Sequence, residues 1–255
     1  MRFARFARAG ALGYGVVDEA GASVDEISTT PFLPFERTGV VHALADVRLV
    51  APCLPSKIVA IGLNYRAHAV ERGDSLPAVP LFFFKPSTAV VGPGGMIVRP
   101  QGCKQLDYEG ELAVVIGAVA RGVDEHRWQE VVLGYTCAID ATARDLQMVD
   151  PQWGRAKGFD TSAPLGPWIE TAVNPADLHL ETRVNGHAVQ DASTQDLLFS
   201  VPALIAYVTS YVTLLPGDVI MTGTPEGPGP VKAGDRVEVE ISGIGTLAVG
   251  VSDRA

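Results

Sequence analysis

Most apolar residues of the chain lie in short runs between glycine, proline and polar residues. Runs of this length predict strands more readily than helices. The predicted strands are Gly13–Val17, Ser23–Ile27, Lys57–Leu63, Pro80–Pro86, Glu109–Ile116, Gly134–Ile139, Val219–Met221 and Val237–Ile241. Leu178–Val184 and Ala188–Gln190 flank Asn185-Gly186, a dipeptide typical of a tight turn, so this segment predicts a hairpin.

Three segments predict helices. Tyr65–Arg72 is followed by Gly73, which ends a helix readily, and Asp124 can cap a helix that runs through Val132. The third begins at Ser200, has Pro202 in its first turn and continues to Val212. Because strands outnumber helices and do not alternate regularly with them, the pattern argues against a doubly wound sheet.

A proline-rich stretch, Leu49–Lys57, divides the chain. It predicts a small strand-rich annex over residues 1–50 and a main domain over residues 51–255.

Composition narrows the class of protein. The 255 residues include 27 glycines and 18 prolines, which argues against a helical bundle, and 47% are hydrophobic, which argues against disorder. The formal net charge of -9 argues against a nucleic acid or an anionic membrane as partner, because binding to phosphates needs clustered Lys and Arg.

The chain has features typical of a cytoplasmic protein. Its longest apolar run, Leu112–Ala120, is about half the length of a membrane span, and the N-terminal segment does not read as a signal peptide. Cys53, Cys103 and Cys137 are an odd number at wide spacing, which predicts buried thiols rather than disulfides or a zinc site.

The segment DYEGELAVVIG, Asp107–Gly117, carries the first candidate chemistry. In a strand, Glu109 and Glu111 point to the same face, and the apolar residues that follow occupy both faces. Two carboxylates at the start of a buried strand need a cation between them, because burial disfavours their charged form. They either share a metal ion or are solvated at a frayed strand end.

A third carboxylate, Asp140, ends the apolar strand of CAIDATARDLQ, Cys137–Gln147. A carboxylate at this point is a candidate metal ligand or catalytic base. Three oxygen ligands without Cys or His would favour Mg²⁺ or Mn²⁺ over zinc.

His68 and Glu71 lie three residues apart, and therefore on one face of the predicted helix. A carboxylate bonded to one imidazole nitrogen raises the basicity of the other, so this pair can act as a general base. An exposed helical His/Glu pair is the alternative. Thr224, in TGTP, lies in a turn that can hold a carboxylate or be an ordinary turn, and Lys157 can be a site residue or a surface lysine.

Taken together and in this order, the motifs resemble the fumarylacetoacetate hydrolase family. The matching segments are GLNYRAHAVE, FFFKP, DYEGELAVVIG, GYTCAIDATARDLQ, KGFDTSAPLGPW, PGDVIMTGTPEG and GDRVEVEISGIGTL. The resemblance runs from about Pro52 to Leu247, and the annex resembles that of single-domain bacterial members. It implies an α+β, mainly β fold: a mixed β-sandwich roll with a few short helices, usually as a homodimer.

The resemblance also implies residue roles. Glu109, Glu111 and Asp140 match the family's ligands to Mg²⁺ or Mn²⁺, and His68 and Glu71 match its catalytic dyad. The family's active-site lysine falls on Lys157, and its substrate-binding residues fall on Arg144, Gln147 and Thr224.

The activity implied is metal-dependent hydrolysis of a C–C bond in a small anionic 2-oxo acid or 1,3-dicarbonyl compound, such as an acylpyruvate or fumarylacetoacetate. The alternatives are decarboxylation of an oxaloacetate-type compound, isomerisation of 2-hydroxyhepta-2,4-diene-1,7-dioate, and a non-catalytic role. Two departures from the family pattern bear on this choice: Ile139 replaces the usual Asn before the metal Asp, and the C-terminal segment reads GTLAVGV.

Overall fold

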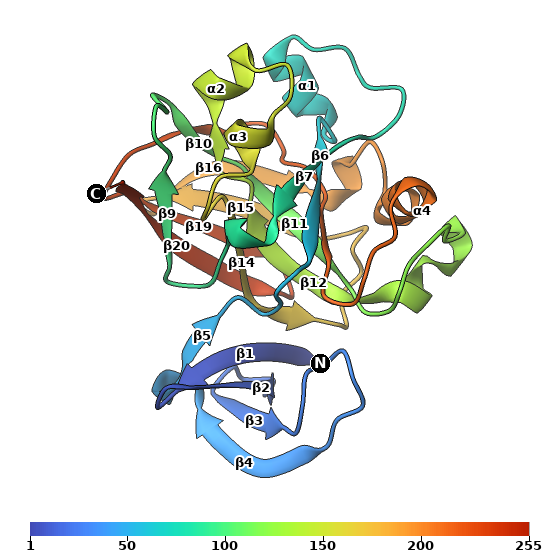
Figure 1. Cartoon of the computed structure of the whole chain (residues 1–255), viewed down its shortest axis with the longest axis vertical. Helices are drawn as coiled ribbons and strands as arrows, with labels where there is room; N and C mark the ends of the chain where they lie inside the picture. The colour runs from blue at the N-terminus through green and yellow to red at the C-terminus, as the bar shows by residue number, and fades with distance from the viewer. Residues whose placement is uncertain (255) are drawn as a thin grey trace.

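Strands form most of the regular structure in the computed structural model, which describes residues 1–254 (Figure 1). The strands of the largest sheet are β1 Arg2–Arg8, β2 Ala11–Val17, β3 Ser23–Ile27, β4 Arg37–Ala43, β5 Arg48–Val50, β6 Lys57–Gly62, β7 Leu81–Pro86, β8 Val90–Val91, β11 Gly110–Ile116, β12 Val132–Ile139, β14 Ala163–Glu170 and β17 Val219–Met221. Their order is β4-β3-β2-β1-β14-β12-β11-β17-β6-β7, with β5 beside β1 and β8 beside β14. Parallel and antiparallel pairs both occur in it, which confirms the predicted mixed, mainly β class.

Two smaller sheets and a few short helices complete the fold. The five-stranded sheet contains β9 Met96–Arg99, β15 His179–Val184, β16 His187–Ser193, β19 Arg236–Ile241 and β20 Gly245–Asp253, and the three-stranded sheet contains β10 Leu106–Tyr108, β13 Thr142–Ala143 and β18 Gly229–Val231. The α-helices are α1 Arg66–Arg72, α2 Arg144–Val149, α3 Gly154–Lys157 and α4 Val201–Tyr211, and the 3-10 helices are Leu44–Asp46, Ser87–Ala89, Glu125–Val131 and Thr194–Asp196. Within residues 1–254, no helix is both long and apolar enough to span a membrane.

Strand β11 lies at the centre of the molecule, and all seven of its residues are buried. Leu112, Val114 and Ile116 point into a core that the five-stranded sheet and α4 share, whereas Ala113 and Val115 belong to a second core on the other face. The sequence therefore correctly predicted that this strand is apolar on both faces.

The N-terminal strands β1–β4 lie together at one end of the molecule, and β5 leads from them into the larger body (Figure 1). β1 pairs antiparallel with β14 through Arg2 opposite Glu170 and Phe3 opposite Ile169. The large sheet is therefore continuous from the annex into the body. The domain boundary at residue 50 stays a prediction.

Several local signals in the sequence have the expected structure. Asn185 and Gly186 both have positive φ, 52° and 81°, as a type I′ hairpin turn requires. Gly73 ends α1 in the left-handed conformation, with φ 72°. The three cysteines are buried free thiols, as predicted.

Other local predictions were incomplete or wrong. The helix predicted over residues 124–132 is a 3-10 helix, Glu125–Val131, although Asp124 begins it by accepting a hydrogen bond from the His126 N–H. Ser200 precedes α4, but its side chain makes no capping bond. β1, β4, β14 and β20 were not predicted, because glycine, proline or charged residues interrupt their apolar patterns.

A buried aspartate joins the strands that lead to the site. The side chain of Asp218, in the turn before β17, is 0% exposed and accepts hydrogen bonds from the Ser56 N–H at 2.9 Å, the Ser56 hydroxyl at 2.7 Å and the Leu215 N–H at 2.8 Å. Lys57 Nζ also pairs with it. Burial would raise the pKa of Asp218, but the hydrogen bonds from Lys57, Leu215 and Ser56 hold it below its usual value.

Replacing this carboxylate tests its contribution to stability. Because its folded-state pKa is depressed, Asp218 stabilises the fold above its unfolded-state pKa, and that contribution is lost as the pH falls through the folded-state value. Asp218→Asn should lower the free energy of unfolding by about 3 kcal/mol at neutral pH, and the deficit should shrink in acid. Urea unfolding at neutral pH and at acidic pH measures this difference in the free energy of unfolding, with the exposed Asp46→Asn as control. A deficit that does not depend on pH would contradict the assignment.

Candidate active site and metal centre

The centre of the site lies at one end of β11 and β12. These strands pair antiparallel with Gly110 opposite Ile139, which places Glu109 beside Asp140, and the Asp140 N–H donates to the Glu109 carbonyl oxygen at 2.8 Å. Glu111 lies two residues further on and accepts a hydrogen bond from the Gly223 N–H at 2.8 Å. Strand pairing therefore brings together carboxylates that are about thirty residues apart in the chain.

The carboxylates of Glu109, Glu111 and Asp140 converge on one point. One oxygen from each lies within 4.8 Å of the others, and all three residues are at most 5% exposed. Three converging carboxylate oxygens fit a hard divalent cation. The alternative of two solvated glutamates at a frayed strand end is wrong for this pair.

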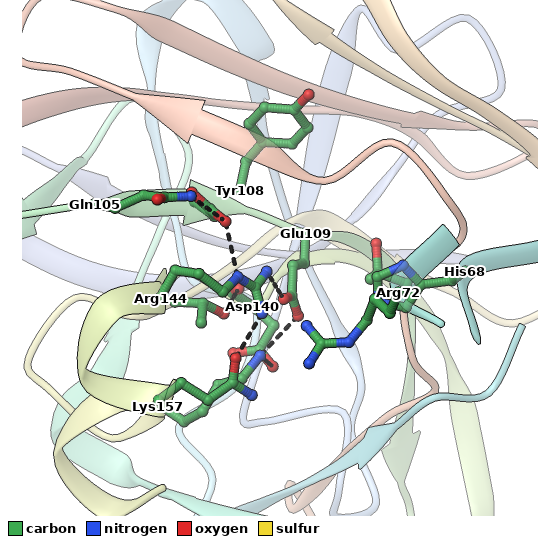
Figure 2. Close-up of polar contacts among 12 residues, drawn as sticks. His68, Arg72, Gln105, Tyr108, Glu109, Asp140, Arg144 and Lys157 are labelled. Atoms are coloured by element: carbon green, nitrogen blue, oxygen red, sulfur yellow. Dashed lines mark hydrogen bonds and ion pairs between the residues drawn. The ribbon is translucent and has the colours of Figure 1, made fainter. Parts of the chain in front are cut away.

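Three buried cations contact Glu109 and Asp140, and Figure 2 shows two of them, Arg144 and Lys157. Lys157 Nζ lies 2.7 Å from both Glu109 Oε2 and Asp140 Oδ2, and Lys85 Nζ lies 2.6 Å from Asp140 Oδ1. Arg144 Nη2 lies 2.5 Å from Glu109 Oε1, and its Nε donates to Asp107 Oδ2 at 2.8 Å. Lys157 is 3% exposed, so it is not the surface lysine of the alternative interpretation.

The ionisation of these groups follows their partners. Burial would raise the pKa of Glu109, but the charges of Lys157 and Arg144 hold it at about 2. Burial raises the pKa of Glu111 well above its usual value, and the charges of Asp140 and Glu109 raise it further. Glu111 has no cationic partner within residues 1–254, so its charge is the one that a metal ion would balance.

The pKa values of the two buried lysines, Lys85 and Lys157, also follow from their partners. Burial lowers the pKa of Lys85, and one aspartate does not restore it. Burial acts against Lys157 as well, but Asp140 and Glu109 together raise its pKa above the usual value.

His68 and Glu71 form the predicted contact on α1. His68 Nδ1 lies 3.1 Å from Glu71 Oε2, and His68 is 5% exposed, so the alternative of an exposed pair is wrong for the histidine. Glu71 also accepts hydrogen bonds from the Gly227 N–H, at 3.2 Å and 3.3 Å. Glu71 therefore orients the imidazole and joins α1 to the loop after β17.

A cavity of about 210 Å³ is lined by His68 of the dyad and by Glu109 of the acidic cluster. This volume is below the about 300 to 1,000 Å³ of pockets for drug-sized ligands, so the cavity fits only a smaller molecule. The cavity is lined by Ile61, Gly62, Leu63, His68, Arg72, Asp74, Leu81, Phe83, Glu109, Arg144, Gln147, Trp153, Lys157 and Thr224.

The remaining predicted substrate-binding residues also line the cavity. Gln147 Oε1 accepts a hydrogen bond from Arg144 Nη1 at 2.6 Å. The Thr224 hydroxyl donates to the Gly110 carbonyl oxygen at 2.9 Å and accepts from Gln190 Nε2 at 2.8 Å. Thr224 thus has a structural contact as well as a place in the cavity wall.

Sequence reasoning missed Lys85 and Asp107. Lys85 lies on β7 and is 0% exposed, and its ammonium also donates to the Lys157 carbonyl oxygen. A lysine between Phe84 and Pro86 offers no sequence signal that it points inward at an aspartate 55 residues away. Ile139, which replaces the family's Asn, points into the apolar core, and Asp140 is held by the two lysines instead.

Comparison with known proteins agrees with this geometry. Residues 57–252 match the model of the fumarylacetoacetate (FAA) hydrolase C-terminal family, and residues 1–52 match the Rv2993c-like N-terminal family. The chain therefore belongs to the fumarylacetoacetate hydrolase family. It is 44% identical to protein Rv2993c of Mycobacterium tuberculosis over 255 residues, which cover 97% of this chain and 96% of that protein.

Solved structures show the same fold. The 2-hydroxyhepta-2,4-diene-1,7-dioate isomerase of Mycobacterium marinum superposes with a TM-score of 0.92 at 43% identity, covering 100% of this chain and 99% of the other. The maleylpyruvate hydrolase of Sphingobium sp. SYK-6, in complex with manganese(II) and pyruvate, superposes with a TM-score of 0.81 at 33% identity, covering 100% of both chains. Related proteins thus include both hydrolases and isomerases.

Removing the missed lysine tests the charge pairing. Lys85→Met should lower the free energy of unfolding by about 3 kcal/mol, because Asp140 stays buried with one of its two cations gone. Chemical denaturation of the metal-free protein measures this, and the exposed Lys232→Met serves as control. A Lys85→Met protein as stable as its control would contradict the pairing.

Proposed function

We propose that this protein is a divalent-metal-dependent hydrolase that cleaves a C–C bond in a small 2-oxo acid or 1,3-dicarbonyl compound. The observation that carries the proposal is a cavity lined both by His68, which Glu71 contacts, and by Glu109, one of three converging buried carboxylates. Neither element alone specifies hydrolysis, but together they provide a base for water and a site for a Lewis acid.

Glu109, Glu111 and Asp140 would hold Mg²⁺ or Mn²⁺. The related maleylpyruvate hydrolase, whose structure contains manganese(II) and pyruvate, supports a divalent cation in this protein. When bound, the cation supplies a Lewis acid that polarises a carbonyl group and stabilises negative charge next to it.

Lys157 and Arg144 would hold the substrate's oxygens. Lys157 Nζ contacts the same carboxylates that would bind the metal, so the cation would compete with the ammonium for Glu109 and Asp140. A released Lys157 can donate to a substrate oxygen, as can Arg144 and Gln147 at the cavity wall.

His68 would activate water. With Nδ1 directed at Glu71, its Nε2 is the nitrogen left to take a proton from a water molecule in the cavity. The resulting hydroxide would attack the carbonyl carbon distal to the carboxylate cluster. The bond from that carbon to its neighbouring carbon would then break, and the neighbouring carbon would keep the electron pair as a stabilised carbanion. One product is a carboxylic acid, and the other is a 2-oxo acid once its carbon is protonated.

A specific observation also supports isomerisation, the second candidate. The similar Mycobacterium marinum protein is a 2-hydroxyhepta-2,4-diene-1,7-dioate isomerase. In that reaction the dyad would move a proton between carbons instead of activating water. Decarboxylation of an oxaloacetate-type compound would need neither step.

The predicted homodimer and cytoplasmic location stay predictions.

A panel of substrates with excess Mg²⁺ tests the proposal. Acetylpyruvate and fumarylacetoacetate should be hydrolysed, and EDTA should abolish their turnover. His68→Ala should reduce hydrolysis by about 10²- to 10⁴-fold and leave any decarboxylation of oxaloacetate largely intact, because loss of CO₂ requires no activated water. Full activity in EDTA would refute the metal requirement, and equal loss of both reactions would refute the role of His68.

A further inference from the structure

The buried side chain of Gln190 joins the five-stranded sheet to two parts of the candidate site. Gln190 lies on β16 and is 2% exposed. Its Oε1 accepts a hydrogen bond from the Gly110 N–H at 2.9 Å. Its Nε2 donates to the Thr224 hydroxyl at 2.8 Å and to the Pro225 carbonyl oxygen at 3.1 Å. One amide therefore contacts both β11 and the loop that follows β17.

On the strand side, Gln190 holds the backbone between two of the candidate metal ligands. Gly110 stands between Glu109 and Glu111 in the chain. A Cβ at Gly110 would lie 2.1 Å from the Thr182 hydroxyl oxygen and 3.1 Å from Gln190 Oε1, so only glycine allows this close approach. The bond to Gln190 thus fixes the main chain from which both carboxylate side chains start.

On the other side, the amide holds the loop of residues 222–227. Two N–H groups of this loop contact residues of the site. The Gly223 N–H donates to Glu111 at 2.8 Å, and the Gly227 N–H donates to Glu71 at 3.2 Å and 3.3 Å. The position of this loop therefore affects a carboxylate of the acidic cluster and the carboxylate of the dyad together.

The loop packs against β16 at the position of the amide. Gly227 has φ 89°, and a Cβ on it would lie 2.3 Å from the Val189 carbonyl oxygen, so this contact also requires glycine. The Tyr108 hydroxyl donates to the Gly227 carbonyl oxygen at 2.8 Å. Between these contacts, Gln190 binds the middle of the loop. Removing the amide would leave buried polar groups without partners, which is costly.

We propose that Gln190 is a positioning residue that sets Glu111 and Glu71 together, through the backbone of Gly110 and the loop of residues 222–227. A neutral amide suits this role, because it accepts from an N–H and donates to oxygens without adding charge to the buried carboxylates. The functional consequence rests on the proposed function, because it assumes that Glu111 binds a metal ion and that Glu71 orients the base.

Hydrogen exchange of glycine amides tests this role without metal or turnover. The N–H groups concerned belong to Gly110, Gly223 and Gly227, so NMR of protein labelled with ¹⁵N-glycine observes them selectively. In metal-free Gln190→Met, Gly223 and Gly227 should exchange about 10-fold faster, the size expected when a buried hydrogen bond is lost. Gly134, buried in β12, should stay within about 2-fold of the wild type, because the large sheet is unchanged.

Mn²⁺ affinity provides the second measurement. Calorimetric titration of Gln190→Met should give a Kd for Mn²⁺ about 10-fold above that of the wild type, because Glu111 is held less firmly. The matched control is Gln129→Met, since Gln129 is exposed on the 3-10 helix Glu125–Val131. This control should keep both the wild-type exchange rates and the wild-type affinity.

A second variant tests the proposal if Gln190→Met does not fold. Thr224→Val removes one acceptor of the amide and leaves the bond from the Gly110 N–H to Gln190. Exchange should accelerate at Gly227, three residues further along the loop, and should not change at Gly110. Unchanged exchange at Gly227 in this variant would overturn the proposal.

Three results with Gln190→Met would also overturn it. They are unchanged exchange at Gly223 and Gly227, an equal acceleration at Gly134, and an unchanged Kd for Mn²⁺ when the wild type binds this ion. An equal acceleration at Gly134 would show that the amide stabilises the fold as a whole and does not position the loop.

Failure of the proposed function would look different. If the wild type binds no Mn²⁺ but exchange at Gly223 and Gly227 accelerates in Gln190→Met, the metal assignment is wrong and the positioning of the loop stands. If the wild type binds Mn²⁺ and hydrolyses acetylpyruvate but the exchange rates do not respond, the inference about Gln190 is wrong and the hydrolase assignment stands.

Discussion

The arrangement of buried charge where β11 and β12 meet determines what this molecule can do. Four buried carboxylates, those of Asp107, Glu109, Glu111 and Asp140, lie with only three buried cations. A cluster of this kind is stable only if each charge finds a partner, because burial removes the solvation that water would provide. The carboxylate left over is Glu111, and it lies beside the two carboxylates with which it would bind a metal ion.

The fold places Glu109, one member of this cluster, in the same cavity as His68. α1 follows β6 along the chain, and β6 lies beside β17, whose C-terminal loop contacts both Glu111 and Glu71. One loop therefore contacts a residue of the acidic cluster and a residue of the dyad, and His68 and Glu109 line one small cavity. β7 and β11 carry Lys85 and Glu111, α2 and α3 carry Arg144 and Lys157, and α1 carries His68, so strands and short helices together position the charged groups.

Local sequence patterns predicted the central parts of this arrangement and missed those that depend on distant pairing. The alternation in Glu109–Ile116 put Glu109 and Glu111 on one face of a buried strand, and the spacing of His68 and Glu71 put them on one face of a helix. Both patterns left a solvated alternative open, and the family resemblance favoured the buried site that the structure has. Lys85 was missed because its partner, Asp140, lies on another strand and nothing near Lys85 indicates that it is buried. β14 was missed for a related reason: it is a central strand that contains Gly166 and Pro167, residues that ordinarily indicate a turn.

Crystallography with Mn²⁺ tests most directly whether the buried carboxylate without a cationic partner, Glu111, marks a metal site. An anomalous difference map of crystals grown with excess MnCl₂ should show a peak coordinated by oxygens of Glu109, Glu111 and Asp140, and crystals of Glu111→Gln should lose it. The isosteric amide can still accept the hydrogen bond from the Gly223 N–H, so the variant should remain folded. Absence of the peak in the wild type, or an undiminished peak in Glu111→Gln, would contradict the account.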